Sequence, residues 1–297
     1  MAYDETGGIP VVAGALGALV TLPGQVQYGD MLMGVSTPAG WLELVGWRDA
    51  PDTQVADTLR PQAHGSYPGD VFGESTVVTY TYLLRGTPDA KLLALTAIER
   101  NTRIDGVDRP LVVDDGGGAS YRLARVTARS IPQGKHFRHA PLECSIQWVC
   151  ADPRRYSLTE QTGTAELATS SGGLVYPLVY PLEYGTTSGG SVMVAQDGNA
   201  DAPLQATFVG PLINPVLTSS TGWRLAFDLS LASGETLVVD TGEGTALLDG
   251  TTDRLYTVSP TGSPLELCTI PPDGATVSLS AASGSGTCDV ATRHAYL

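Results

Sequence analysis

The aspartate at position 240 stands in the sequence context of a catalytic residue. The run VVDTG at residues 238–242 has the order in which an aspartic protease presents its reactive carboxylate. That mechanism needs a second carboxylate that shares a proton with the first. Asp249 is close by, but it falls in the next turn, and the chain has no second lobe comparable to the first. We therefore interpret Asp240 as the end of a strand and the start of a turn.

Other hydrolytic chemistry has no better support in the chain. A glycosidase needs two carboxylates about 5 to 9.5 Å apart in a sugar-binding cleft, and among 31 acidic residues composition alone nominates no pair. The G-x-S-x-G motif of serine hydrolases is absent. Two of the four histidines lie in GKHFRH (residues 134–139), which we interpret as an exposed basic connection rather than a metal site. The histidines are His64, His136, His139 and His294.

Two short acidic runs contain the oxygen ligands that calcium prefers. Asp114 and Asp115 are adjacent, and DGNAD occupies residues 197–201, but neither run has the ligand periodicity or the terminal glutamate of an EF-hand. We expect both to be turns. Since G-x-G-x-x-G, P-loop and CxxC motifs are also missing, the sequence predicts no enzyme: no catalytic residue, no cofactor-binding residue and no metal ligand.

The charge balance argues against nucleic acid and membranes as partners. The chain has 17 basic and 31 acidic residues, which gives a formal net charge of −14. Residues 1–157 contribute −3 to that charge, and residues 158–297 contribute −11. An acidic chain repels both phosphate backbones and anionic lipid surfaces.

An apolar stretch from Ile9 to Leu22 has the general look of an export signal. It follows Asp4 and Glu5 instead of Lys or Arg, which is the wrong charge for such a signal. It is also too short and too glycine-rich to span a membrane. We expect an N-terminal arm or an early strand, and synthesis in the cytoplasm.

The four cysteines are too sparse in 297 residues for a disulfide scaffold. Cys144 and Cys150 lie on one expected strand and are separated by roughly 20 Å, which prevents them from pairing. Cys268 and Cys288 could meet across two strands. Two buried thiols are the commoner outcome in a reducing cytosol, and this is what we expect.

Alternation of apolar and polar residues is the dominant structural signal and indicates a mainly β fold. Three segments show it clearly, and we expect each to be a strand with one buried face. Their apolar faces are Val78, Tyr80, Tyr82 and Leu84; Leu142, Cys144, Ile146, Trp148 and Cys150; and Trp223, Leu225, Phe227, Leu229 and Leu231.

One helix and one hairpin complete the first half. Thr87 can cap a helix that begins at Pro88 and ends near Asn101, with apolar residues at helical spacing. Residues 111–113 and 121–128 flank DDGGG, which predicts a hairpin with a flexible tip. The apolar helix positions are Leu92, Leu95 and Ile98.

The second half begins with a change of composition. Residues 157–173 are rich in Ser, Thr, Gly and Ala, which predicts a solvated linker at a domain boundary. Beyond it, Gly/Asp turn signals recur about every ten residues, as in a β-sandwich.

Several short motifs follow one another along the chain in a characteristic order. RPQAHG (60–65) and YPG (67–69) precede the strand, the helix and the hairpin, and CSIQWVCADPRRY (144–156) is the most specific motif. In the second half come FVGP (208–211), GETLVVDT (234–241) and Asp249-Gly250. In order and spacing these motifs resemble the distal tail protein family of siphophages, the long-tailed bacteriophages.

The resemblance implies a structural hub at the tail tip of a virion. Residues 1–157 would form a β-barrel or split-sheet domain with one packed helix, and six copies would make a ring that continues the tail tube. Residues 158–297 would form the linker and a peripheral galectin-like β-sandwich. The implied partners are further copies of the chain, the tail tube protein, the tape-measure or tail hub protein and the receptor-binding or tail fibre proteins. DNA would pass through the ring without specific binding, and no cofactor is implied.

A second interpretation keeps the same location but a different role. The C-terminal domain would itself bind a saccharide of the host wall, as a carbohydrate-binding adhesin module. Its exposed aromatic side chains would form the binding face, although Trp223 belongs to an apolar stripe and is better explained as core. The candidates are Tyr176, Tyr180, Tyr184, Trp223 and Tyr256.

Overall fold

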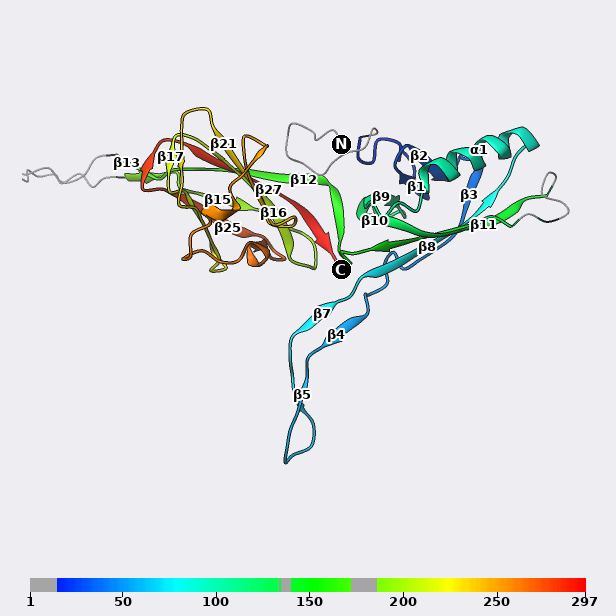
Figure 1. Ribbon diagram of the computed structural model, residues 1–297, viewed down its shortest axis with the longest axis horizontal. Coiled ribbons are helices and arrows are strands. Elements are labelled where there is room, and N and C mark those ends of the chain that lie inside the picture. Colours follow the sequence, from blue (N-terminus) through cyan, green and yellow to red (C-terminus); the bar gives the residue numbers. More distant parts are fainter. Residues whose placement is uncertain (1–14, 133, 135–139, 172–185) are drawn as a thin grey trace, which may run out of the picture. The chain divides into compact units, whose positions relative to one another are not determined.

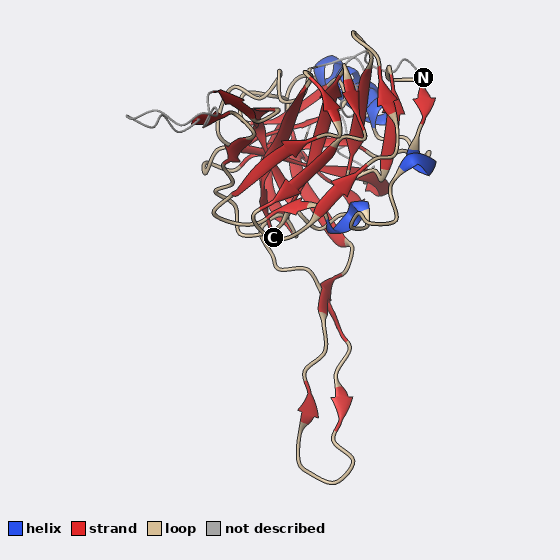
Figure 2. Ribbon diagram, turned by 90° about the vertical axis from the view of Figure 1, so that its left-hand side faces the viewer, coloured by secondary structure: helices blue, strands red, loops and turns tan. Residues whose placement is uncertain are grey.

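The chain folds into two compact units that consist mainly of β-strands. The computed structural model describes residues 15–132, 134, 140–171 and 186–297. The units are Pro10–Leu158, here the N-terminal unit, and Thr159–Tyr296, here the C-terminal unit. Strands dominate the fold (Figure 2), and the single α-helix of the described residues, α1, lies in the N-terminal unit (Figure 1). The predicted mainly β fold with one helix is confirmed.

The N-terminal unit contains two antiparallel sheets that share one long strand. One sheet has the order β3-β8-β11-β10 and the other the order β2-β1-β9-β10. The shared strand, β10, pairs with β9 as far as Ala124 and with β11 from Arg125 on, and its register with β11 shifts between Val126 and Ala128. The strands are β1 (Gln25–Tyr28), β2 (Met31–Gly34), β3 (Ala39–Val45), β8 (Thr76–Leu84), β9 (Arg109–Asp114), β10 (Ala119–Ser130) and β11 (Leu142–Cys150).

The apolar faces of β8 and β11 form the centre of this unit's core. The two strands pair along their whole length, from Thr76 opposite Cys150 to Leu84 opposite Leu142. Every second residue of both strands is buried, because side chains alternate between the two faces of a strand. The strand predictions for these two segments and the β9-β10 hairpin are confirmed.

Helix α1 (Pro88–Asn101) packs beside this core, with the predicted bounds. The hydroxyl of Thr87 accepts a hydrogen bond from the backbone N–H of Ala90 (3.3 Å), so the expected N-cap is present. The helix buries Lys91, Leu95 and Ile98. Leu92, which we expected on the packed face, is 62% exposed, because the spacing of the buried positions places it just outside the buried stripe.

In the described part of the Ile9–Leu22 segment, residues 15–22, the early strand that we allowed for is absent. Residues 15–24 form turns, while residues 9–14 lie outside the described residues. Two buried glutamines hold these turns through their side-chain oxygens. Gln25 accepts from the backbone N–H groups of Thr21 and Leu22, and Gln27 accepts from that of Leu19.

A long two-stranded hairpin interrupts the N-terminal unit between β3 and β8. We call residues 53–73 the arm. Its stem pairs β4 (Thr53–Val55) with β7 (Val71–Gly73), and its outer part pairs β5 (Thr58–Leu59) with β6 (Ser66–Tyr67). The arm leads away from the sheets of its unit in both views (Figures 1 and 2).

The C-terminal unit is a β-sandwich. One layer is β27-β16-β21-β22-β23, with β12 next to β27 and β24 next to part of β16; the other layer is β15-β25-β18-β19. Apolar residues of both layers form one core, in which Phe208 and Phe227 meet edge to face at 5.9 Å. The first layer comprises β12 (Arg155–Glu166), β16 (Ala202–Val209), β21 (Thr236–Asp240), β22 (Thr245–Leu248), β23 (Thr252–Asp253), β24 (Thr269–Ile270) and β27 (Thr287–Tyr296); the second comprises β15 (Ser191–Val194), β18 (Val216–Ser219), β19 (Arg224–Ala226) and β25 (Ala275–Ser280).

Shorter elements complete the C-terminal unit. One small sheet has the order β20-β17-β26, and β13 pairs with β14. Two 3-10 turns, η1 and η2, lie between β23 and β24. Their bounds are β13 (Thr169–Ser171), β14 (Thr186–Ser188), β17 (Leu212–Ile213), β20 (Ser230–Leu231), β26 (Ser283–Gly284), η1 (Leu255–Thr257) and η2 (Leu265–Leu267).

Two sequence predictions for the second half are wrong. The expected linker at residues 157–173 is strand β12 as far as Glu166, because its threonines suit a pleated strand as well as a solvated loop. The expected strand from Trp223 to Leu231 is divided into β19 and β20. Ala226 and Phe227 are both buried, which breaks the alternation, and Phe227 forms an isolated bridge with Val258.

The four cysteines are buried and free, as the sequence predicts. Burial raises the pKa of the Cys150 thiol to about 11 and that of the Cys268 thiol also to about 11, so both are protonated thiols at neutral pH. Within the described part of the chain, no helix has the length and apolar character needed to cross a membrane.

Candidate assembly surfaces

The arm exposes apolar side chains along its whole length. All residues of β4, β5 and β7 are exposed. Leu59 is 80% exposed and Phe72 is 64% exposed, and the facing pair Val55 and Val71 is more than half exposed. An isolated two-stranded hairpin is at best marginally stable in water. An arm of this composition therefore has the properties of a segment that becomes buried against a partner.

Asp57 organises the outer half of the arm. Its carboxylate accepts hydrogen bonds from the hydroxyl of Ser66 (2.8 Å) and from the backbone N–H of Gly69 (3.0 Å). These two bonds lower the pKa of Asp57. Gly69 is required here, since an added Cβ would lie 2.1 Å from the carbonyl oxygen of Ala56. These contacts link the two sides of the hairpin and give the arm a defined conformation.

The root of the arm is fixed by the residues that follow β3. Gly46 has a φ of +82°, and a Cβ there would lie 2.0 Å from the carbonyl oxygen of Val77. The fully buried Arg122 donates to the Gly46 carbonyl (2.8 Å) and lies over the ring of Trp47, 5.2 Å from its centroid. Arg48 makes a two-bond ion pair with Asp115 (2.5 and 2.7 Å). These contacts hold the start of the arm against the tip of the β9-β10 hairpin.

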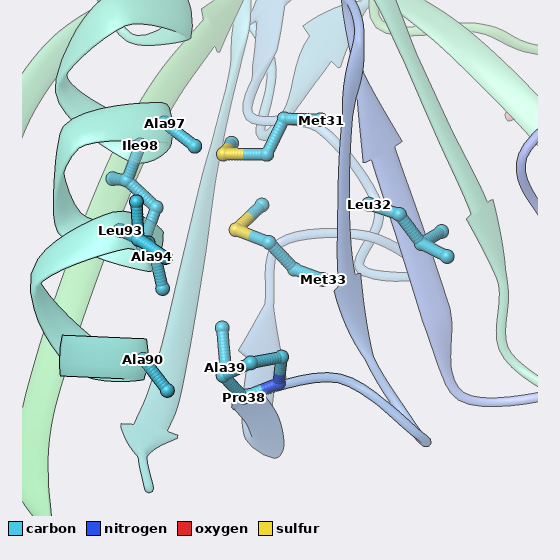
Figure 3. Close-up of a pocket in the computed structure, with 10 residues that line it drawn as sticks. All are labelled: Met31, Leu32, Met33, Pro38, Ala39, Ala90, Leu93, Ala94, Ala97 and Ile98. Atoms are coloured by element: carbon cyan, nitrogen blue, oxygen red, sulfur yellow. The ribbon is translucent and has the colours of Figure 1, made fainter. Parts of the chain in front are cut away.

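A groove of about 320 Å³ lies between α1 and β2, and all ten residues that line it are apolar. Figure 3 shows Met31 and Met33 pointing from β2 toward the helix, with Leu93 and Ala97 on the helical side. Leu93 is 73% exposed although it borders the groove. Methionine side chains adapt readily to a bound surface, so this groove suits an apolar side chain of a partner.

Charge differs between the arm and the helix. Residues 50–75 contain Arg60 as their single cation and four acids, a net charge of −3. Residues 85–103, which include α1, contain four cations and two acids, a net charge of +2. The exposed cations there are Arg85, Arg100 and Arg103, and the acids of the arm region are Asp52, Asp57, Asp70 and Glu74.

Two strands of the N-terminal unit have an open side. Among the described residues, β3 pairs only with β8, and β2 pairs only with β1. An open strand edge presents unpaired backbone N–H and C=O groups, which can pair with another chain. These edges are therefore further candidate contact sites.

Asp152, in the most specific sequence motif, fixes the turn from β11 into β12. Its carboxylate accepts from the backbone N–H and the guanidinium of Arg154 (2.9 Å each) and from the hydroxyl of Tyr156 (2.6 Å). Burial would raise the pKa of Asp152, but these hydrogen bonds outweigh it and the pKa is lowered. The role of the Asp-Pro-Arg-Arg-Tyr segment is thus structural.

The residues considered for catalysis and for metal binding have structural partners. The Asp240 carboxylate accepts from the backbone N–H groups of Gly242 (2.8 Å) and Glu243 (2.9 Å), which is turn chemistry. Asp249, at φ +49°, accepts from the backbone N–H of Thr236. Within the described residues, no group of three or more His, Cys, Asp or Glu side chains could hold a metal ion.

The two calcium candidates also contact neighbouring residues of the chain, and two of the histidines can be placed in the structure. Asp114 accepts from the backbone N–H of Gly116 (2.9 Å), and Asp197 lies 3.6 Å from His294. His64 is exposed near the tip of the arm. His136 and His139 lie outside the described residues.

The aromatic candidates do not form a common face in the described structure. Trp223 is buried in the core, as the sequence predicts, and donates to the carbonyl of Thr269 (2.7 Å). Tyr256 is 76% exposed beside Arg254. Tyr176, Tyr180 and Tyr184 lie outside the described residues.

Comparison with known proteins identifies the fold. No protein-family model and no curated protein matches the chain. Among solved structures, the chain has the fold of phage tail hub and baseplate proteins. The crystal structure of the Dit protein of phage SPP1, described as a paradigm of the hub adsorption apparatus in phages that infect Gram-positive bacteria, matches with a TM-score of 0.64 at 12% identity. The match covers 92% of this chain and 99% of the SPP1 protein.

Two structures of the phage P2 baseplate in its activated conformation are similar at a lower level. The one with Ca has a TM-score of 0.51 and the one with Sr a TM-score of 0.50, each at 8% identity. Both matches cover 91% of this chain and 97% of the baseplate chain. The resemblance to distal tail proteins that the sequence motifs suggest is therefore also found in the fold.

The arm and the groove are the features that sequence reasoning missed. The strands of the arm have two or three residues each, too short for period-two alternation to be visible. A usable signal was present, because the segment between Trp47 and Thr76 intersperses Asp, Pro, Gly and Ser with short apolar pieces of one or two residues.

Proposed function

We propose that this chain is a structural virion protein of a long-tailed bacteriophage, a distal tail protein that forms a hexameric ring between the tail tube and the tail tip. The observation that carries the proposal is the similarity of nearly the whole chain to the SPP1 hub protein. The N-terminal domain (residues 1–157) forms the ring, and the C-terminal domain (residues 158–297) is a peripheral, galectin-like sandwich. The protein is not an enzyme and uses no cofactor.

The surface of the N-terminal unit supports a role in self-assembly. Open edges at β2 and β3, exposed apolar side chains on the arm and an apolar groove occur together on this one unit. A closed ring satisfies such surfaces by repeating one contact between identical copies. Residues 1–157 have a net charge of only −3, so two copies of the N-terminal domain approach each other without strong like-charge repulsion.

The other partners follow from position in the tail. The ring contacts the tail tube protein on one side and the tape-measure or tail hub protein on the other, and its periphery carries receptor-binding or tail fibre proteins that mediate host attachment. DNA passes through the lumen during ejection without specific binding. The protein is made in the host cytoplasm and resides in the virion at the tail tip.

The mass and the shape of the purified full chain test the proposal. One copy has a mass of 31.0 kDa, so a ring of six has about 186 kDa (6 × 31.0 kDa). Light scattering after size-exclusion chromatography should give this mass, and negative-stain microscopy should show rings with sixfold symmetry. A 31.0 kDa species at every concentration, with no rings, contradicts the proposal.

The adhesin alternative is tested separately. In that case the C-terminal domain binds a saccharide of the host wall, with the exposed Tyr256 as an aromatic contact. A glycan array probed with the full chain and with its Tyr256→Ser variant distinguishes the two roles. Saccharide binding that the variant loses favours the adhesin, and absence of binding favours the hub.

A further inference from the structure

We propose that the stem of the arm of one copy binds in the α1-β2 groove of an adjacent copy, with Phe72 as the central contact. This inference rests on the proposed ring and names the contact that joins neighbouring copies. The occupant of the groove is thus a second copy of this chain. The two halves of the contact are the stem, which has acidic neighbours in the sequence, and the apolar groove on α1, whose segment (residues 85–103) has a net positive charge.

The geometry of the N-terminal unit separates the arm from its own groove. Strand β8 begins at Thr76, directly after the arm, and ends at Leu84, directly before α1. Its nine residues span roughly 26 Å at about 3.3 Å per residue. The arm leads away from α1 in both ribbon views (Figures 1 and 2). The stem of one copy is therefore placed to contact the α1-β2 groove of a second copy and not its own.

The surfaces of the two halves match in kind, because both are apolar. Phe72 is 64% exposed and lies opposite Gln54 on one face of the stem, whereas the exposed pair of Val55 and Val71 lies on the other face. The groove of about 320 Å³ has only apolar walls, and its rim includes the exposed Leu93. Aromatic side chains that enter an apolar pocket are typical anchors of protein interfaces. Met31 and Met33 at the floor can adjust to the shape of the ring.

The charges of the two halves have opposite signs. The stem is flanked by four acids and lacks a basic residue, since Arg60 lies in the outer part of the arm. Arg100 and Arg103 lie in the last turn of α1 and just beyond it and are exposed. Complementary charges at the rim of an apolar contact orient the partners and speed their association. The same charges disfavour contact between two stems or between two helices.

Cysteine cross-linking in the full chain tests this contact directly. All four native cysteines are buried, so introduced cysteines at exposed positions react selectively. The double variant Gln54→Cys/Leu93→Cys keeps Phe72 and places one thiol opposite it on the same face of the stem. Treated with a short bifunctional maleimide, this variant should give a ladder of covalent oligomers that ends at six copies. Each single variant should remain monomeric in a denaturing gel, because the contact joins two different residues.

A matched control and a mixing experiment give the result its specificity. Leu93→Cys combined with Tyr256→Cys, a position of similar exposure in the C-terminal unit, should give no ladder. A mixture of the two single variants, Gln54→Cys and Leu93→Cys, should give a covalent dimer, which shows that the contact is between copies.

The outcomes separate this inference from the proposed function. Rings of six copies without a ladder between positions 54 and 93 overturn the arm-in-groove contact and leave the hub function standing. A monomeric double variant that cross-links only within one chain also overturns the inference. A monomeric wild-type chain that shows no rings and no ladder overturns both.

Discussion

Each of the two units of this chain has a buried apolar core, but their surfaces are very different. The N-terminal unit exposes most of the large apolar side chains that the described residues leave in solvent, on the arm, on α1 and on β3. The C-terminal unit exposes few of them, and its half of the chain has a net charge of −11 against −3 for the other half. Since exposed apolar surface is typical of interaction sites, the difference favours the N-terminal unit as the place for the proposed contact between copies.

The first prediction tests whether the difference is confined to the surface. Phe208 and Trp148 are both fully buried, one in each core. Phe208→Ala and Trp148→Ala should each lower the free energy of unfolding by about 3–5 kcal/mol, the usual cost of removing a buried aromatic ring. Urea titration followed by circular dichroism measures this cost.

The control for both core variants is Leu92→Ala, because Leu92 is 62% exposed and its loss should change stability by no more than about 0.5 kcal/mol. A Trp148→Ala variant as stable as this control would mean that the N-terminal core is loose. The exposed apolar surface of that unit would then reflect a weak fold, and the comparison between the units would fail.

The second prediction concerns assembly. Phe72→Ser should weaken self-association at least tenfold, which corresponds to about 1.4 kcal/mol, because it removes the proposed anchor of the interface. The stability of the monomer should stay within about 0.5 kcal/mol of the wild type, since Phe72 is largely exposed. Sedimentation over a dilution series measures the association.

The matched variant lies in the C-terminal unit. Tyr256→Ser removes an aromatic ring that is even more exposed than that of Phe72, and it should leave association unchanged. Equal weakening by both variants would remove the contrast between the two surfaces.

The third prediction concerns stability in acid. The pKa of Asp152 is lowered from 3.8 in the folded chain, so its interactions stabilise the fold fully above that pH. The stabilisation is lost as the pH falls below 3.8 through the folded pKa. Asp152→Asn should cost about 1.5–3 kcal/mol at pH 7, the usual range for hydrogen bonds to a charged group. The variant should also lose less stability than the wild type between pH 4 and pH 2.

Urea midpoints at pH 7, 4 and 2 measure both effects. Asp197→Asn, at a largely exposed carboxylate of the C-terminal unit, is the control and should follow the wild type. An Asp152→Asn variant with the same loss in acid as the wild type would assign the acid sensitivity to other carboxylates.

The sequence predicted the parts of the fold that are long and regular. Strands β8 and β11 and helix α1 have nine, nine and fourteen residues, enough for period 2 or period 3.6 to be visible. The division of the Trp223–Leu231 segment was not predictable in this way, because it depends on the bridge between Phe227 and Val258. Local patterns do not contain such contacts between distant residues.

The candidate interface could not be predicted from local sequence patterns either, for the same reason. The groove combines β2 with α1, which are separated by more than fifty residues in the chain. Leu93 gives no sign in the sequence of facing a groove instead of a core. By contrast, the turn role of Asp240 followed from its own neighbours, and the hydrogen bonds to Gly242 and Glu243 are local.

The smallest expected effect is at the root of the arm. Arg48 and Asp115 form a two-bond ion pair, but the Arg48 side chain is 59% exposed, and exposed ion pairs contribute only about 0.2–1 kcal/mol. Arg48→Met should therefore lower the stability of the chain by no more than that, and less at high salt. If the pair instead holds the arm for assembly, the same variant should weaken association measurably while unfolding hardly changes. Sedimentation and urea titration on one sample separate the two effects, and a loss of stability above about 1 kcal/mol would show that the arm root belongs to the core of its unit.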